Sequence, residues 1–255
     1  MAASENTLKR RLAKGDVLTG CWLGFTDPYA SEIVGTAGFD WVLIDAEHAP
    51  NDINRISQQI GVLQSSPSEV LVRVPIGEDW IIKQVLDAGA QSLMVPMVET
   101  GEQAAAVVRA MRYAPDGVRG VGALLGRASG WSSIADYTQT ANSQMCLIVQ
   151  VEAQRGLDNL DDILSVDGVD GVFIGPADLA ADMGHLGNPN APDVQAAMED
   201  AVKKIRSAGK TAGIMCTDPA FAQKSLSWGV NFAAVAIDVV VLAQSLRKIA
   251  ASYAK

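Results

Sequence analysis

The sequence contains few of the residues that form disulfides or bind soft metals. Among its 255 residues there are three cysteines and two histidines. Cys21, Cys146 and Cys216 lack CxxC spacing and lie in or beside apolar segments, which is typical of reduced core thiols in a cytosolic protein. Because both residue types are scarce, the sequence argues against a zinc site built from histidine and cysteine. We therefore expect a cytoplasmic protein with buried, unreactive thiols.

The sequence also lacks long apolar segments and an excess of basic residues. No apolar segment reaches the ~18 residues that a membrane helix needs, and the polar segment from Met1 to Arg11 lacks the apolar region of a signal peptide. The formal net charge of -9 argues against nucleic acid and anionic membranes as partners. An acidic small substrate stays compatible, because a few local arginines override the mean charge.

A short pattern recurs along the chain: a helical stretch, a glycine, a polar residue and then an apolar segment. It occurs at Gly38, Gly89, Gly168 and Gly229, and more loosely at Gly209. Glycine closes helices in the left-handed conformation, and the apolar segments are typical of strands buried on both faces. Eight strands are predicted, at residues 17–23, 41–44, 70–74, 93–95, 145–151, 172–174, 212–214 and 232–236.

Eight strands that alternate with helices in about 250 residues predict a (β/α)8 barrel, with residues 1–255 forming one domain. A doubly wound open sheet is the alternative. Such a sheet usually has a G-x-G-x-x-G turn after its first strand, whereas Trp22 to Thr26 reads Trp-Leu-Gly-Phe-Thr. In a barrel the C-terminal ends of all strands converge on one face, where active sites lie.

Chemically active side chains follow several of the predicted strands. In chain order they are Trp22, Asp45, His48, Arg73, Gln150, Glu152 and Asp178. Asp45 and His48 form a candidate acid–base dyad, in which the carboxylate raises the basicity of the imidazole. A polar cap on the following loop is the alternative. Arg73 is suited to bind a carboxylate or polarise a carbonyl oxygen, and its alternative is a structural ion pair with Asp45 or Glu47.

Glu152 and Asp178 end neighbouring strands, which lie ~4.8 Å apart in a sheet. Two carboxylates at that distance repel each other unless a cation lies between them. Oxygen ligands suit Mg²⁺ or Mn²⁺. The alternative is that Glu152 caps a helix starting near Arg155 and Asp178 occupies the first turn of the next helix. For both carboxylates together, we favour the metal.

The segment Gly175-Pro176-Ala177-Asp178 is predicted to turn from a strand into a helix. The free N–H groups of Ala177 and Asp178 then form a site for a carboxylate, and Pro176 suits the first helical turn. Trp22 is a candidate for the wall of the same pocket, with a plain core position as an equal alternative.

Taken together, these residues resemble the HpcH/HpaI aldolase family, the metal-dependent class II pyruvate aldolases. The resemblance covers nearly the whole chain. It is carried by residues 39–51 (FDWVLIDAEHAPN), 94–99 (MVPMVE), 117–122 (GVRGVG), 150–152 (QVE) and 174–179 (IGPADL).

The resemblance implies a (β/α)8 barrel that forms a homohexamer, a trimer of dimers, with the C-terminal helix packed on a neighbouring subunit. It implies Glu152 and Asp178 as ligands of a divalent metal ion (Mg²⁺, Mn²⁺ or Co²⁺), with Arg73 on the keto oxygen and Asp45 with His48 as the acid–base. Gln150 and the Gly175 to Asp178 turn would lie at the pyruvate, and Met215 in a variable pocket wall. The implied reaction cleaves 4-hydroxy-2-oxo acids to pyruvate and an aldehyde, with oxaloacetate decarboxylation as a side activity.

Three alternatives stay open. A related acyl-CoA lyase of the citrate or malyl-CoA lyase type would share the barrel and metal, but the sequence shows no clear basic patch for the nucleotide. An enzyme of phosphorylated sugars would need a phosphate site after the last two strands, where the expected glycine-rich turn is missing. A non-enzymatic barrel would not need Arg73, His48, Glu152 and Asp178 on one face.

Overall fold

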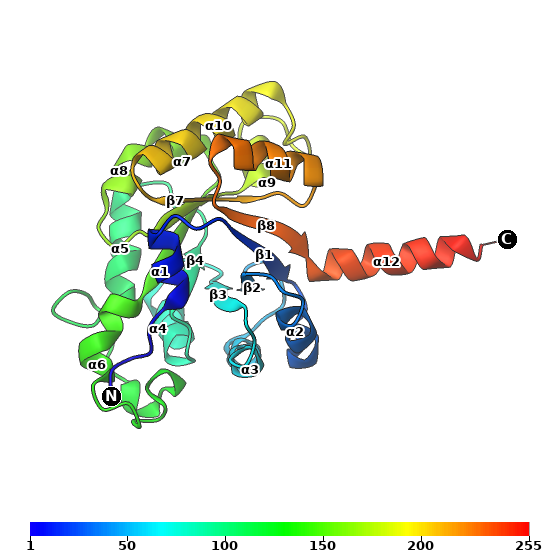
Figure 1. The fold of residues 1–255 in the computed structure, drawn as a ribbon. Coiled ribbons are helices and arrows are strands. Elements are labelled where there is room, and N and C mark those ends of the chain that lie inside the picture. Colours follow the sequence, from blue (N-terminus) through cyan, green and yellow to red (C-terminus); the bar gives the residue numbers. More distant parts are fainter. Residues whose placement is uncertain (255) are drawn as a thin grey trace.

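Eight parallel strands form a closed barrel in the computed structural model, which describes residues 1–254 (Figure 1). Each strand pairs with the next in chain order, and β8 pairs with β1. The strands are β1 (Leu18–Leu23), β2 (Trp41–Asp45), β3 (Glu69–Arg73), β4 (Ser92–Val95), β5 (Cys146–Val151), β6 (Gly171–Ile174), β7 (Thr211–Met215) and β8 (Phe232–Ile237). The predicted (β/α)8 barrel is confirmed, and every predicted strand end lies within one residue of the observed one.

Of the α-helices described, ten lie between successive strands on the outside of the barrel, one precedes the first strand and one follows the last. They are α1 (Thr7–Ala13), α2 (Pro28–Gly35), α3 (Ile53–Leu63), α4 (Asp79–Asp87), α5 (Gly101–Met111), α6 (Tyr137–Thr140), α7 (Gln154–Asp158), α8 (Leu160–Ser165), α9 (Pro176–Asp182), α10 (Pro192–Ser207), α11 (Pro219–Trp228) and α12 (Asp238–Ser252). Three short 3-10 helices, Ala123–Leu125, Arg127–Ser129 and Ala141–Gln144, lie with α6 in the connection before β5. No helix described between residues 1 and 254 is long and apolar enough to cross a membrane.

The recurring glycines close helices before strands, as predicted. All five have a positive φ, a conformation that other residues rarely adopt. They are Gly38 (93°), Gly89 (113°), Gly168 (101°), Gly209 (74°) and Gly229 (112°). At the end of α11 the closure is complete, because Gly229 donates its N–H to the carbonyls of Ser225 and Leu226. These turns return the chain to the N-terminal end of the barrel after each helix.

Large side chains fill the interior of the barrel. Trp41 stacks on Phe232 with ring centroids 4.1 Å apart. A Cβ at Gly20 would lie 2.0 Å from the Trp41 ring, so a glycine is required where this ring crosses the interior. At the N-terminal end, Leu8 and Leu12 of α1 pack against the same interior cluster.

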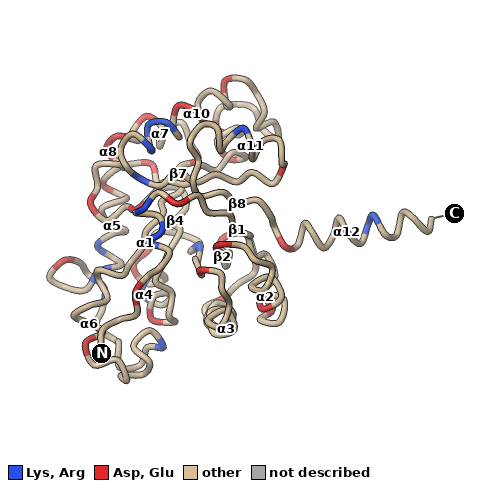
Figure 2. Tube along the Cα trace, viewed as in Figure 1, with Lys and Arg blue, Asp and Glu red and all other residues tan. Residues whose placement is uncertain are grey.

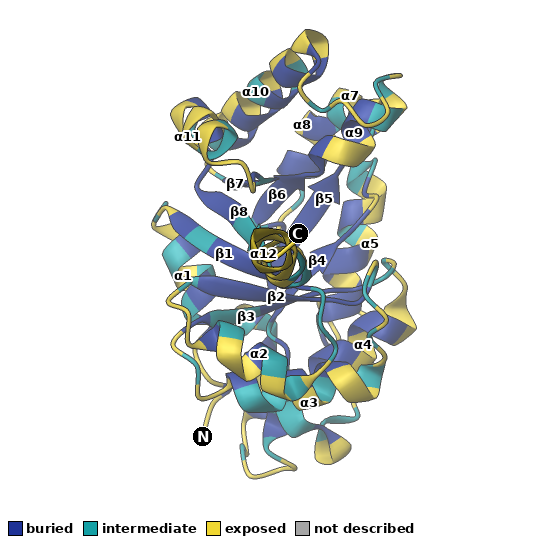
Figure 3. Cartoon of the chain, turned by 90° about the vertical axis from the view of Figure 1, so that its right-hand side faces the viewer, coloured by how far each residue is buried: buried dark blue, intermediate teal, exposed yellow. Residues whose placement is uncertain are grey.

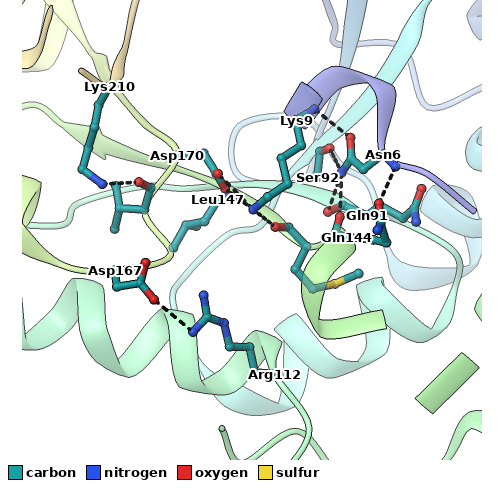
Figure 4. A network of polar contacts seen from close by, with 12 residues as sticks. Asn6, Lys9, Gln91, Ser92, Arg112, Gln144, Leu147, Asp167, Asp170 and Lys210 are labelled. Carbon is teal, nitrogen blue, oxygen red and sulfur yellow. Dashed lines mark hydrogen bonds and ion pairs between the residues drawn. The ribbon is translucent and has the colours of Figure 1, made fainter. Parts of the chain in front are cut away.

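Polar contacts hold α1 across the N-terminal end of the barrel (Figure 4). Asn6 caps the helix by accepting the N–H of Lys9 at 2.9 Å. The Lys9 ammonium pairs with Asp170 at 2.9 Å and donates to the Met145 carbonyl at 2.6 Å. Lys210 donates to the Val169 carbonyl at 2.6 Å beside this network. Because α1 closes this end, a ligand reaches the barrel from the opposite, C-terminal end.

The last helix, α12, leaves the barrel and projects into solvent (Figures 1 and 3). Its first residue, Asp238, is buried and accepts the N–H groups of Gly24 and Phe25 at 2.7 and 3.1 Å. Beyond that anchor, exposed apolar side chains include Leu246 and Ile249. Figure 2 shows few charged residues along this helix. It therefore exposes an apolar face that its own barrel does not cover.

Candidate active site

A cavity of about 600 Å³ opens at the C-terminal end of the barrel. Ten of the eleven predicted site residues line it: Trp22, Asp45, His48, Arg73, Gln150, Gly175, Pro176, Ala177, Asp178 and Met215. The eleventh, Glu152, is buried directly beside this wall. The parallel arrangement of the strands thus brings together residues that lie far apart in the chain.

Arg73 is the most constrained side chain of this cavity. It ends β3 beside Asp45 of β2, its register partner in the sheet. Its Nε and one terminal nitrogen donate to the two oxygens of Asp45 at 2.9 and 2.7 Å. The other terminal nitrogen pairs with Glu47 at 2.6 Å, and the guanidinium lies 4.9 Å from the centroid of the Trp22 ring. Two of its five N–H donors are thereby used in hydrogen bonds to Asp45, while the Glu47 contact is an ion pair only, so N–H donors stay free for a ligand in the described structure.

This arrangement differs from the predicted carboxylate–imidazole dyad. Asp45 accepts the main-chain N–H groups of Glu47 and His48 at 3.0 and 3.4 Å, whereas no hydrogen bond joins its carboxylate to the imidazole in the described chain. The ion pair of Arg73 with Asp45 and Glu47, which sequence reasoning treated as the alternative, is the contact that forms. The physical reason is register, since Arg73 lies directly opposite Asp45, while His48 lies on the loop beyond it. The imidazole lines the cavity without a side-chain partner among residues 1–254.

The two carboxylates beside Arg73 respond differently to burial. Burial alone raises the pKa of Asp45, but the hydrogen bonds and charge of Arg73 outweigh it and hold this pKa below its ordinary value of 3.8. Burial raises the pKa of Glu47 above 4.5, although the charge of Arg73 opposes this change. Asp45 is therefore the firm counter-ion of Arg73. Glu47 was considered only as an ion-pair partner from the sequence, and its place beside the cavity emerges from the structure.

Glu152 follows β5 and is held by two donors. The N–H of Met97 donates to one carboxylate oxygen at 3.0 Å, and the Gln150 amide donates to the other at 2.5 Å. It does not cap the next helix, because α7 begins after Ala153 without a side-chain cap. Burial, together with the charges of Asp178 and Glu47, raises the pKa of Glu152 to about 7. The carboxylate is thus held in a place where its negative charge is poorly stabilised by the protein alone.

Met97 was not singled out from the sequence. Its φ of 55° is unusual for a residue with a side chain, and this backbone conformation coexists with the N–H bond to Glu152. The only sequence signal was its place in the segment 94–99, which bears the family resemblance; Met97 itself has no polar side chain. Strain of this kind is found at functional sites.

Gly175 and the start of α9 complete the wall beside Glu152. A Cβ at Gly175 would lie 2.6 Å from a Glu152 oxygen and 3.2 Å from the Gln150 amide nitrogen, so the position requires glycine. Pro176 is the first residue of α9, as predicted, and no side chain caps this helix. Asp178 lies in the first turn of this helix and also lines the cavity. The helix position and the cavity position, which the sequence offered as alternatives, are therefore compatible.

Oxygen atoms at this wall suit a divalent cation. The charge of Asp178 helps to raise the pKa of both Glu152 and Glu47, and the charge of Glu47 helps to raise the pKa of Glu152. A cation would relieve that repulsion. The side-chain oxygen of Gln150 is buried and accepts no hydrogen bond in the described structure. No cage of three or more histidine, cysteine or acidic side chains is present within residues 1–254. Any ion here would therefore take most of its ligands from water and substrate, as Mg²⁺ commonly does.

The chain is similar to known aldolases along its whole length. The HpcH/HpaI aldolase/citrate lyase family model matches residues 18–245. A hydroxypyruvate/pyruvate aldolase of Roseovarius nubinhibens is 58% identical, over 99% of this chain and 98% of that protein. A 4-hydroxy-2-oxo-heptane-1,7-dioate aldolase of Klebsiella pneumoniae is 49% identical, over 98% and 94%.

A solved structure supports the same relationship. The crystal structure of a HpcH/HpaI aldolase/citrate lyase family protein from Burkholderia cenocepacia superposes with a TM-score of 0.93 and 42% identity, covering 97% of this chain and 98% of that one. Because it is about half identical to several aldolases over nearly its full length, this protein is a carbon–carbon lyase. The chain belongs to the HpcH/HpaI aldolase/citrate lyase family.

Proposed function

We propose that the enzyme cleaves 4-hydroxy-2-oxo acids into pyruvate and an aldehyde, catalyses the reverse addition, and decarboxylates oxaloacetate. The observation that carries this proposal is the position of Arg73 at the cavity, where its ion pairs with Asp45 and Glu47 fix the guanidinium and leave N–H donors without a hydrogen-bond partner in the described structure. A guanidinium held in this way is suited to stabilise the negative charge that develops on a keto oxygen.

We assign the residues as follows. Glu152 and Asp178 hold a divalent metal ion, which supplies Lewis-acid polarisation of substrate oxygen when bound. The N–H groups of Ala177 and Asp178 at the start of α9 receive the carboxylate of the pyruvate half. Gln150 positions Glu152 through its hydrogen bond.

In the cleavage direction, His48 removes the proton from the C4 hydroxyl and the C3–C4 bond breaks. The electron pair passes to the C2 oxygen and gives the pyruvate enolate, whose charge Arg73 stabilises. Protonation at C3 then gives pyruvate. Decarboxylation of oxaloacetate reaches the same enolate with loss of carbon dioxide, so it needs Arg73 but no base for a hydroxyl proton.

The composition of the cavity wall favours an aldolase over the acyl-CoA lyase alternative. Arg73 is the one cationic side chain that lines the cavity in the described chain, and it is already paired with two carboxylates. A nucleotide phosphate would find no free basic partner in this wall. A lysine Schiff base is also disfavoured, because Lys210 lies at the closed N-terminal end (Figure 4).

We also propose that the protein forms a homo-oligomer, a homohexamer by family resemblance, in which α12 packs on a second copy. The support is its exposed apolar side chains, with Leu246 and Ile249 exposed by 56% and 57%. Contiguous apolar surface of this kind marks interaction sites.

The function is tested with metal-stripped enzyme, pyruvate and a panel of aldehydes, with products identified by mass spectrometry. Aldol products should form only after Mg²⁺, Mn²⁺ or Co²⁺ is added. Full activity after exhaustive chelation would overturn the metal assignment. Absence of aldol product with every metal and aldehyde would overturn the proposed reaction.

A further inference from the structure

The connection between α9 and α10, residues 183–191, borders the cavity on its far side. It comes after β6 and α9, whereas Arg73 ends β3 and His48 follows β2 across the barrel. Pro189 and Asn190 of this connection line the cavity. The side chain of Asn190 is exposed and has no hydrogen-bond partner within the described residues. A neutral donor and acceptor is thus available across the barrel from Arg73 and His48.

A buried glutamine ties this connection to two helices. Gln195 of α10 lines the cavity and is 9% exposed. Its amide nitrogen donates to the Pro189 carbonyl at 3.0 Å, and its oxygen accepts from the Lys224 ammonium of α11 at 2.9 Å. An ammonium only donates, so the amide oxygen must face Lys224 and the NH₂ group must face Pro189. The lysine therefore orients the glutamine, and the glutamine holds the backbone next to Asn190.

Few side chains pack against this connection at its glycines, so side-chain hydrogen bonds contribute to its position. Gly184 and Gly187 have positive φ and no atoms within 4 Å of an added Cβ. Its beginning is held by His185, which contacts Asp193 of α10 at 2.8 Å. The Gln195 bond holds its end, where the chain borders the cavity. The nitrogen of Lys224 also lies 5.4 Å from the Trp228 ring centroid, which restrains the lysine.

We propose that Asn190 binds a hydroxyl group of the aldehyde and that Gln195 and Lys224 are positioning residues for it; this rests on the proposed function. The ligand is an uncharged, hydroxylated aldehyde. Apart from Arg73, the described cavity wall offers no cation for a phosphate or second carboxylate. The same wall contains Thr217 and the acidic Asp218, whose negative charge repels anions. In the described wall, Arg73 is thus left to the pyruvate half, and Asn190 offers the aldehyde an uncharged hydrogen-bonding partner.

The test compares wild type, Lys224→Met and the matched control Lys203→Met, whose lysine pairs with Glu199 on the exposed surface of α10. Aldol addition of pyruvate is measured with glyceraldehyde and with propanal, which has no hydroxyl. Lys224→Met should raise KM for glyceraldehyde about three- to tenfold, the scale of one hydrogen bond. KM for propanal and the rate of oxaloacetate decarboxylation should stay unchanged. Lys203→Met should change none of these values.

Further variants separate positioning from general stability. Lys224→Arg retains a donor and should restore most of the affinity for glyceraldehyde. Gln195→Glu retains the partner of Lys224 but loses the donor to Pro189, so it should raise the same KM without lowering Tm. Asn190→Ala should raise KM for glyceraldehyde and not for propanal.

An unchanged KM in Lys224→Met, or an equal rise for both aldehydes, would overturn the positioning role while leaving the aldolase function intact. A parallel loss of decarboxylation would overturn it as well, since the defect would then extend to the pyruvate half. If wild type forms no aldol product with any aldehyde, the proposed function itself fails, and this inference falls with it.

Discussion

Replacement of Arg73 is the sharpest test of the active-site geometry. Arg73→Ala removes the donor assigned to the developing oxyanion, and loss of one such donor lowers rates by about 10²–10³-fold, or ~2.7–4 kcal/mol. Both retro-aldol cleavage and oxaloacetate decarboxylation should fall by this factor. Arg73→Lys should restore little, because one ammonium cannot reproduce the two parallel bonds to Asp45 and the third contact to Glu47.

The same variant should also lower the free energy of unfolding. The side chains of Asp45 and Glu47 are exposed by only 5% and 14%, and removal of one partner from a buried ion pair typically costs about 3–5 kcal/mol. Protonation of one carboxylate would reduce that loss. The free energy of unfolding in urea at pH 7 is therefore measured beside the kinetics. It shows whether each variant is folded under the assay conditions, so that a lower rate reflects lost catalysis and not unfolding.

Arg119→Lys is the matched control for a buried arginine. The Arg119 side chain is fully buried, pairs with Asp87 at 2.6 Å and lies 4.5 Å from the Tyr113 ring centroid, away from the cavity. This variant should lose stability and retain kcat. Two results would refute the hypothesis that the fixed guanidinium of Arg73 stabilises the oxyanion. One is that Arg73→Lys keeps more than about a fifth of wild-type kcat. The other is that Arg119→Lys lowers kcat as much as Arg73→Lys does.

Three further predictions follow from other parts of the molecule. His48→Ala should lower aldol cleavage about 10²–10⁴-fold yet spare most decarboxylation; equal loss of both, with metal still bound, would contradict a role as base. Leu246→Asp with Ile249→Asp should reduce the mass measured by light scattering, and a monomeric wild type at micromolar concentration would rule out the proposed α12 contact. Burial raises the pKa of Asp40, but the Thr19 N–H and the Arg11 side chain outweigh it and hold this pKa below 3.8. The folded state therefore binds this proton less readily than the unfolded state, so the stabilisation is present above about pH 4 and is lost as the pH falls through the lower folded value. Asp40→Asn should flatten the loss of unfolding free energy between pH 5 and 3 in urea titrations, and an unchanged pH slope would refute this assignment.

Much of the fold could be read from local patterns. Runs such as Trp41 to Ile44 are apolar on both faces because parallel barrel strands are covered inside and outside. The glycines before five of the eight strands have a positive φ, which is a local property of the backbone. These signals need no knowledge of distant residues, and they placed every strand within one residue.

Which residues form the site could also be predicted from the sequence, because a barrel brings the ends of its strands to one face. Which of these residues contact each other could not be predicted. Asp45 lies three residues from His48 in the chain, yet its carboxylate pairs with Arg73 on the next strand. Likewise, the N–H of Met97, in the loop after β4, donates to Glu152 after β5, 55 residues further along the chain.

The sequence by itself determined the elements, their order and the set of polar side chains at the strand ends, since these depend on hydrophobic pattern and helix closure. Only the tertiary structure decided which of those side chains hold each other. Strand register selects Arg73 as the partner of Asp45, and packing between α10 and α11 joins Lys224 to Gln195 across 29 positions of sequence. Hydrogen bonds extend only about 3 Å and depend on direction, so they follow from the relative positions of packed elements and not from neighbourhood in the chain.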